Sequence, residues 1–88
     1  MLSLRPNDAM KLTYDPRYNI AYLALRDKTD QVETIRIGDE LNIDLAPDGT
    51  IYGIELLNAN EQIQAGNGGG FTIFNEASGQ SSAMQIPA

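Results

Sequence analysis

The sequence predicts a mainly β domain, a five-stranded antiparallel meander that ends in a short helical turn. Three observations lead to this fold class. Apolar and polar residues alternate in several short segments, which is the period-two pattern of half-buried strands. Residues that favour turns separate these segments at close spacing. Strands this close in sequence usually pair as neighbours, and consecutive pairing gives a meander.

The clearest strand pair lies between Leu41 and Asn58. Its first strand ends at Leu45 and alternates apolar with polar residues, and its second strand runs from Ile51 to Leu57. Pro47-Asp48-Gly49 joins them as a turn, because proline presets φ, aspartate bonds its own backbone and glycine supplies a positive φ.

Three earlier segments complete the predicted sheet. Met10 to Tyr14 alternates and stops before a proline, which lacks the N–H that a sheet needs. Ile20 to Arg26 is apolar on both faces, so we expect it at the centre of the sheet or covered by another element. A helix over residues 20–26, which would give an α+β fold, is the alternative, because alanine and leucine favour helices. Val32 to Ile37 forms the remaining strand.

The ends of the chain are predicted to differ from this domain of residues 10–65. Residues 1–9 are expected to form a flexible arm. Asn58 or Asn60 is expected to cap one or two helical turns that end by Ala65. Residues 66–88 begin as a glycine-rich linker. Within them, residues 71–74 are either an extra strand that adds to a sheet edge or unstructured, and residues 75–88 are expected to be disordered.

The composition excludes several functions. The chain contains neither cysteine nor histidine, so it lacks disulfides, thiolate metal sites and the commonest general base. Six basic residues face twelve acidic ones, and the net charge is -6. Such a surface repels phosphate backbones, so we expect no direct binding to nucleic acid. It would attract a basic protein, but the interpretation we prefer is that the acidity simply aids solubility.

No segment indicates targeting or membrane insertion. The first ten residues lack the apolar run of a signal peptide, and no stretch approaches the roughly 18 apolar residues of a membrane span. We therefore expect a soluble, cytoplasmic protein of bacterial type without a cofactor.

Several segments together resemble the small prokaryotic family catalogued as domain of unknown function 2283. They are Met10 to Asp15, Tyr22 within its apolar run, Ile43-Asp44, and Asp48 to Ala59, of which Gly53 to Ala59 is the most specific. The resemblance covers residues 10–63 and implies a compact domain of unestablished activity. Some members look like neighbours of small toxin-like proteins, which implies an antitoxin-like role. The chain has Asn19-Ile20-Ala21-Tyr22 where members usually have an acid followed by Ala-Leu-Tyr.

Three polar side chains are the candidate site. Asn42, Asp44 and Glu55 lie on neighbouring predicted strands and could share a face, and their hard oxygen ligands suit Ca²⁺ or Mg²⁺. Asp44 and Glu55 could also couple as acid and base. The competing interpretation is a solvated face of an amphipathic hairpin, because a small open sheet offers no obvious pocket.

The second strand is apolar on both faces, and one short helix cannot cover both faces of a sheet. We therefore predict a homo-oligomer, with a dimer favoured. Gly53, in the middle of a strand, indicates a bulge or a close backbone crossing, and another subunit could provide such a crossing. The expected interface residues are Ile20, Tyr22, Leu23, Leu25, Gly53, Phe71, Ile73 and Phe74. The leading functional interpretation is a non-catalytic protein-interaction module. The alternative is a domain that binds a divalent metal or a small ligand, and an enzyme ranks third.

Overall fold

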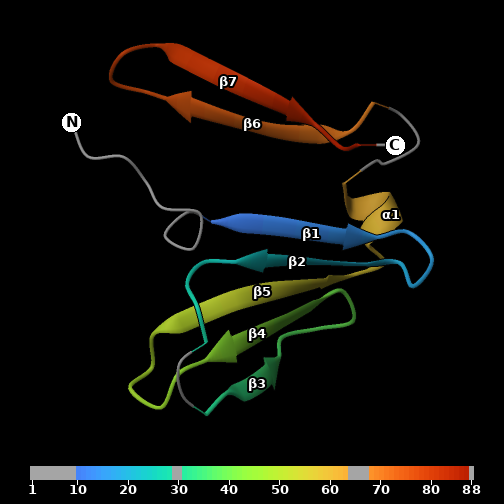
Figure 1. The fold of residues 1–88 in the computed structure, drawn as a ribbon, viewed down its shortest axis with the longest axis vertical. Coiled ribbons are helices and arrows are strands. Elements are labelled where there is room, and N and C mark those ends of the chain that lie inside the picture. Colours follow the sequence, from blue (N-terminus) through green and yellow to red (C-terminus); the bar gives the residue numbers. More distant parts are fainter. Residues whose placement is uncertain (1–9, 29–30, 64–67, 88) are drawn as a thin grey trace.

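The computed structural model describes residues 10–28, 31–63 and 68–87 (Figure 1). It contains seven strands and one helix within these residues. The main sheet is built from β1 (Lys11–Asp15), β2 (Ile20–Ala24), β3 (Glu33–Arg36), β4 (Leu41–Leu45) and β5 (Ile51–Leu57). The helix α1 (Ala59–Gln62) follows, and then a separate hairpin of β6 (Gly70–Asn75) and β7 (Gln80–Gln85).

The predicted fold class is confirmed, because five antiparallel strands form one sheet and a short helix follows them. The alternative of a helix over residues 20–26 is wrong, since residues 20–24 are strand β2. β2 lies inside the sheet, between β1 and β5, as expected for a segment that is apolar on both faces. Its β-branched and aromatic residues fit this half-buried, pleated position.

The order of the strands corrects the simple meander. The sheet runs β1-β2-β5-β4-β3, so β5 rather than β3 pairs with β2 (Figure 1). The physical reason lies in the strands themselves. β5 is the longest, with seven mostly apolar residues, while β3 has four exposed residues, Glu-Thr-Ile-Arg. Short, charged strands belong at sheet edges, where they discourage pairing with other chains.

The register of the strands separates an apolar face from a polar one. The apolar row crosses all five strands and consists of Leu12, Leu23, Ile54, Ile43 and Ile35. On the other face, two rows run beside each other. One contains Tyr22, Glu55 and Asn42, and the other contains Gly53, Asp44 and Thr34. Because side chains alternate along each strand, a single shift in register would exchange the two faces.

Asn19, in the turn between β1 and β2, holds α1 against the end of the sheet. Its side-chain oxygen accepts the backbone N–H of Asn60 at 2.6 Å, and its carbonyl accepts that of Ala59 at 3.0 Å. Asn58 precedes the helix but caps nothing with its side chain, because it adopts a left-handed conformation with φ of 54°. The side chain that satisfies the first turn therefore comes from a different turn, and Ala59 is fully buried beneath it.

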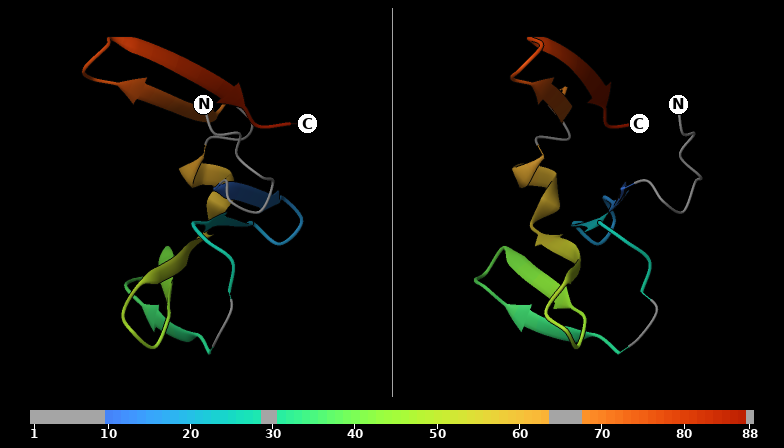
Figure 2. Two further views of the ribbon diagram at one scale, coloured as in Figure 1. Left: turned by 60° about the vertical axis from the view of Figure 1, so that its left-hand side comes forward. Right: turned by 90° about the vertical axis from the view of Figure 1, so that its left-hand side faces the viewer.

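The β6–β7 hairpin corrects the expected disorder of residues 75–88. Strand β7 pairs along its whole length with β6, and the pair forms a sheet of its own beyond β1 (Figures 1 and 2). The turn explains why it forms. The Asn75 side chain accepts the N–H groups of Ala77 and Ser78, and Gly79 takes the positive φ that closes the loop. The predicted strand at 71–74 thus exists, with its partner supplied by the chain itself.

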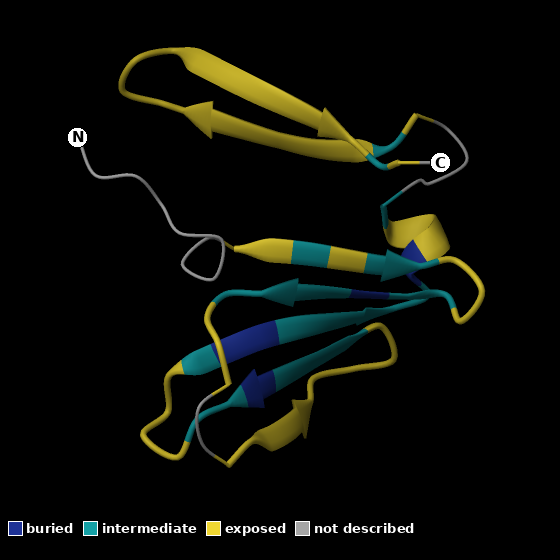
Figure 3. Cartoon of the chain, in the orientation of Figure 1, coloured by how far each residue is buried: buried dark blue, intermediate teal, exposed yellow. Residues whose placement is uncertain are grey.

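The chain builds little interior. Among the described residues no large side chain is fully buried, and both hairpin strands are exposed throughout (Figure 3). The expected flexible arm at residues 1–9 lies outside the described residues, as do residues 64–67 within the predicted end of the domain and its linker. No helix in the described part of the chain is long and apolar enough to cross a membrane.

The hairpin turn gives a first testable expectation. Asn75→Ala removes the acceptor for two N–H groups, so the amides of β6 and β7 should exchange with solvent at least tenfold faster, measured by hydrogen exchange. The amides of β2 and β5 should keep their protection, because the hairpin is a separate local unit. Asn75→Asp keeps the acceptor and is the control. Equal loss of protection in both sheets would contradict this account.

Candidate functional site

The polar face centres on Asp44, a carboxylate that is only 8% exposed. Tyr22 donates its hydroxyl to Asp44 Oδ2 at 2.9 Å, and Thr34 donates its hydroxyl to Oδ1 at 2.7 Å. The Lys28 ammonium lies 3.1 Å from Oδ2 and 4.6 Å from the centroid of the Tyr22 ring. The cluster of Tyr22, Lys28, Thr34 and Asp44, here called the Asp44 cluster, joins β2, β3 and β4 with the segment that leaves β2.

Gly53 makes the Asp44 cluster sterically feasible. It lies on β5, directly between Ala24 of β2 and Asp44 of β4 in the register. A Cβ atom at this position would meet the ring and hydroxyl of Tyr22, well inside van der Waals contact. The close approach at this glycine is made by the Tyr22 side chain of the same chain rather than by a backbone crossing. A register shift of the kind a β-bulge makes, between Asp44 and Leu45, accompanies it. A contact of Gly53 with another subunit stays a prediction.

The electrostatics of the Asp44 cluster follow from burial and hydrogen bonding together. Burial raises the pKa of Asp44, but hydrogen bonds from Thr34, Lys28 and Tyr22 outweigh it, so its pKa lies below the ordinary value. Burial, and next the hydrogen bond to Asp44, raise the pKa of Tyr22. The hydrogen bond to Asp44 is the main cause that raises the pKa of Lys28. At neutral pH the cluster therefore holds a carboxylate, a neutral phenol and an ammonium.

The structure brings the three predicted metal ligands onto one face. Asp44 and Glu55 accept hydrogen bonds from protein donors there, whereas Asn42 Oδ1 is buried without a hydrogen-bond partner. Asn42 donates its amide to Glu55 Oε1 at 2.9 Å, while both oxygens of Asp44 accept donors of the Asp44 cluster. The Lys28 ammonium holds the position beside Asp44 that a cation would need. Within the described ranges, no three acidic, histidine or cysteine side chains gather closely enough to hold a metal.

Asp44 and Glu55, the predicted acid and base, lie on adjacent strands without facing each other. Asp44 is opposite Gly53 and Glu55 is opposite Asn42, so the two carboxylates are diagonal neighbours. Each is already engaged in hydrogen bonds with other side chains. Cross-strand coupling is strongest for directly opposed residues, and this arrangement weakens the case for a paired acid and base.

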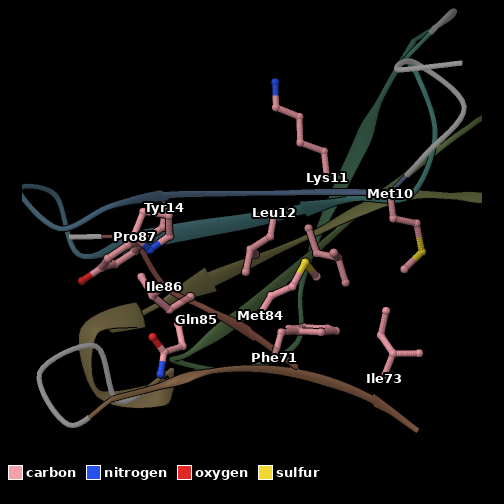
Figure 4. Close-up of a pocket in the computed structure, with 11 residues that line it drawn as sticks. Met10, Lys11, Leu12, Tyr14, Phe71, Ile73, Met84, Gln85, Ile86 and Pro87 are labelled. Atoms are coloured by element: carbon pink, nitrogen blue, oxygen red, sulfur yellow. The ribbon is translucent and has the colours of Figure 1, made fainter. Parts of the chain in front are cut away.

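An apolar groove lies on the other side of the sheet, between β1 and the β6–β7 hairpin (Figure 4). Its volume is about 570 Å³. The sheet contributes Met10, Leu12, Tyr14 and Leu23, and the hairpin contributes Phe71, Ile73 and Met84, with Ile86 and Pro87 at one end. The Lys11 side chain points away from these residues (Figure 4). The sequence contained a partial signal for this groove, namely the aromatic residues beyond the glycine-rich segment.

The predicted interface residues divide between the two faces. Tyr22 belongs to the Asp44 cluster, Gly53 of β5 lies beneath the Tyr22 ring, and Ile20 is two residues before Tyr22 on β2. Leu23, Phe71 and Ile73 line the groove. Leu25 lies past the end of β2, where its N–H is bonded to the carbonyl of Tyr52. Phe74 is an exposed hairpin residue outside the groove lining.

Sequence reasoning missed Lys28 and Thr34 as members of the Asp44 cluster. Lys28 lies in a charged segment that has the composition of a solvated turn, and Thr34 lies in a strand with exposed residues. Neither carries a local signal, because the contact with Asp44 depends on the strand order.

Comparison with known families identifies the family of this chain. Residues 11–60 match the family described as "Protein of unknown function (DUF2283)". The match covers more than half of the chain, so the chain belongs to this family. No curated protein and no solved structure matched it.

The Asp44 cluster makes stability depend on pH in a defined direction. The pKa of Asp44 is lowered in the folded state, so its contribution is present above the unfolded pKa and is lost as pH falls through the folded one. The free energy of unfolding, measured in urea, should therefore fall between about pH 5 and pH 2. Asp44→Asn should cost about 1–3 kcal/mol at pH 7 and flatten this acid dependence.

Asp15→Asn is the matched control. It removes a partly exposed carboxylate that is paired with the exposed Arg17, and such surface pairs contribute about 1 kcal/mol or less. If Asp44→Asn and Asp15→Asn gave the same acid dependence, the Asp44 cluster would have no special role in stability.

Proposed function

We propose that this member of the DUF2283 family is a non-catalytic protein-interaction module. The observation that carries the proposal is apolar surface that the chain leaves uncovered. The apolar row of the sheet is only half-buried or exposed at each position, and Phe74 and Met84 of the hairpin are more than half exposed. Exposed apolar patches in the folded state are typical of surfaces that meet another protein.

The chemistry of the polar face supports an interaction module over an enzyme or a metal site. Asp44, the most buried carboxylate among the described residues, already has three donors, from Tyr22, Thr34 and Lys28. A general base needs a free lone pair within reach of a substrate proton, and a metal ligand needs a free oxygen. The geometry of the Asp44 cluster is that of a group that fixes strands in place.

A small basic protein is the partner that the charge favours, which would make the chain antitoxin-like. The net charge of -6 repels acidic partners and speeds the encounter with basic ones. Part of this charge is gathered at one end of the sheet, where the Asn58 amide donates to both Glu40 and Glu61. Asp39, beside them, has an almost fully exposed side chain.

The test is binding to a small basic protein encoded beside the gene for this chain. Co-expression should give a stable complex on size exclusion, and the association rate should fall at least tenfold between 50 and 500 mM salt, because screening removes the electrostatic attraction. A non-cognate basic protein of equal size and charge should bind at least tenfold more weakly. A genome without such a neighbour, or a neighbour that does not bind, would contradict the antitoxin-like role.

A further inference from the structure

The β6–β7 hairpin and the groove beside it lack the packing that would stabilise them in one chain. Within the described residues, β6 and β7 form strand pairs only with each other, and all twelve of their positions are exposed. An isolated two-stranded hairpin is marginally stable in water. A groove of about 570 Å³ separates the apolar side chains of β1 from those of the hairpin.

The two faces of the hairpin carry different apolar side chains. Ile73 and Phe71 line the chain's own groove, together with Met84 of β7 (Figure 4). Phe74 follows Ile73 directly, and successive residues of a strand point to opposite faces. Phe74 is 57% exposed and does not line the groove of its own chain. An exposed aromatic residue and an unfilled apolar groove therefore occur on the same molecule.

Charge distinguishes a second copy from a basic partner as the occupant of the groove. Neither β6 nor β7 contains a charged residue, and Lys11 is the one charged residue among those that line the groove. A basic protein would find no carboxylate there. Two copies, each with a net charge of -6, would meet without like charges opposed at this surface.

We infer that a second copy of this chain docks at the groove, with Phe74 of each copy entering the groove of the other. The contact is isologous, because the same hairpin and groove serve both copies and a two-fold axis relates them. Phe71 and Ile73 of one chain would then contact Phe74 of its partner. This inference goes beyond the proposed function and does not depend on a basic partner.

The test is the solution mass of the full chain by light scattering across a dilution series. The wild type should show twice the chain mass of 9.6 kDa at micromolar concentration. Phe74→Ser should raise the concentration at which the dimer dissociates at least tenfold, and Ile73→Ser, on the groove side, should do the same. Phe74→Leu keeps an apolar side chain and should remain dimeric, as should Glu76→Gln in the hairpin turn.

Each outcome decides the inference. A wild type that is monomeric at micromolar concentration would overturn it and leave a small apolar molecule as the occupant to test. A Phe74→Ser dimer as tight as the Glu76→Gln dimer would also overturn it, because the interface would lie elsewhere. Circular dichroism of Phe74→Ser should match the wild type, since residues 11–57 form their sheet without this side chain. Binding of the basic neighbour is measured separately, so either proposal can fail alone.

Discussion

The reach of Tyr22 across Gly53 to Asp44 is the constraint on which the rest of the sheet depends. It ties β2 to β4 across the intervening β5, and it does so only because position 53 has no side chain. The hydrogen bond from Thr34 to Asp44 adds the edge strand β3 to this connection. The ion pair between Lys28 and Asp44 holds the segment that follows β2 against the sheet. Burying a carboxylate costs free energy unless the carboxylate is paired and hydrogen-bonded. The three donors offset this cost for Asp44, and their positions also specify where each strand must lie.

This constraint gives a physical meaning to the residues on which the family resemblance rests. Tyr22, Asp44 and Gly53 are far apart in the sequence, yet they meet at one point of the polar face. The Gly-Ile-Glu-Leu-Leu segment combines two tasks. Gly53 accommodates Tyr22, while Ile54 and Leu56 supply the opposite, apolar face. In this structure the residues on which the resemblance rests include a structural device of the sheet, the passage of Tyr22 over Gly53 to Asp44.

A sheet fixed on its polar face still needs a cover for its apolar face, and a four-residue helix supplies little of it. This imbalance connects the fold to the proposals. On the polar face the carboxylates of Asp44 and Glu55 have hydrogen-bond partners, while the apolar side retains a groove and a hairpin with exposed aromatic residues. We therefore propose that the chain makes protein contacts, with a second copy at the groove and a basic partner at the acidic end.

The sequence predicted the strands well, because each strand carries its own period-two pattern and its own turn signals. The strand order escaped prediction, since it depends on β5 being long and apolar enough to pair on both sides. Lys28 escaped because a lysine in a charged turn looks the same whether or not a buried carboxylate lies beside it. The hairpin was half predicted. Phe71 to Phe74 showed strand character, but β7 contains mainly small polar residues, and the Asn75 and Gly79 turn was the overlooked signal.

The most direct test of the central constraint is the cost of Gly53→Ala in two backgrounds, measured as the free energy of unfolding in urea. In the wild type, the added methyl group must displace the Tyr22 ring, and overpacking of this kind costs about 1–3 kcal/mol. In a Tyr22→Ser background the space is free, so the same substitution should cost almost nothing. An equal cost in both backgrounds would contradict the account, because Gly53 would then be needed for a reason other than the passage of Tyr22.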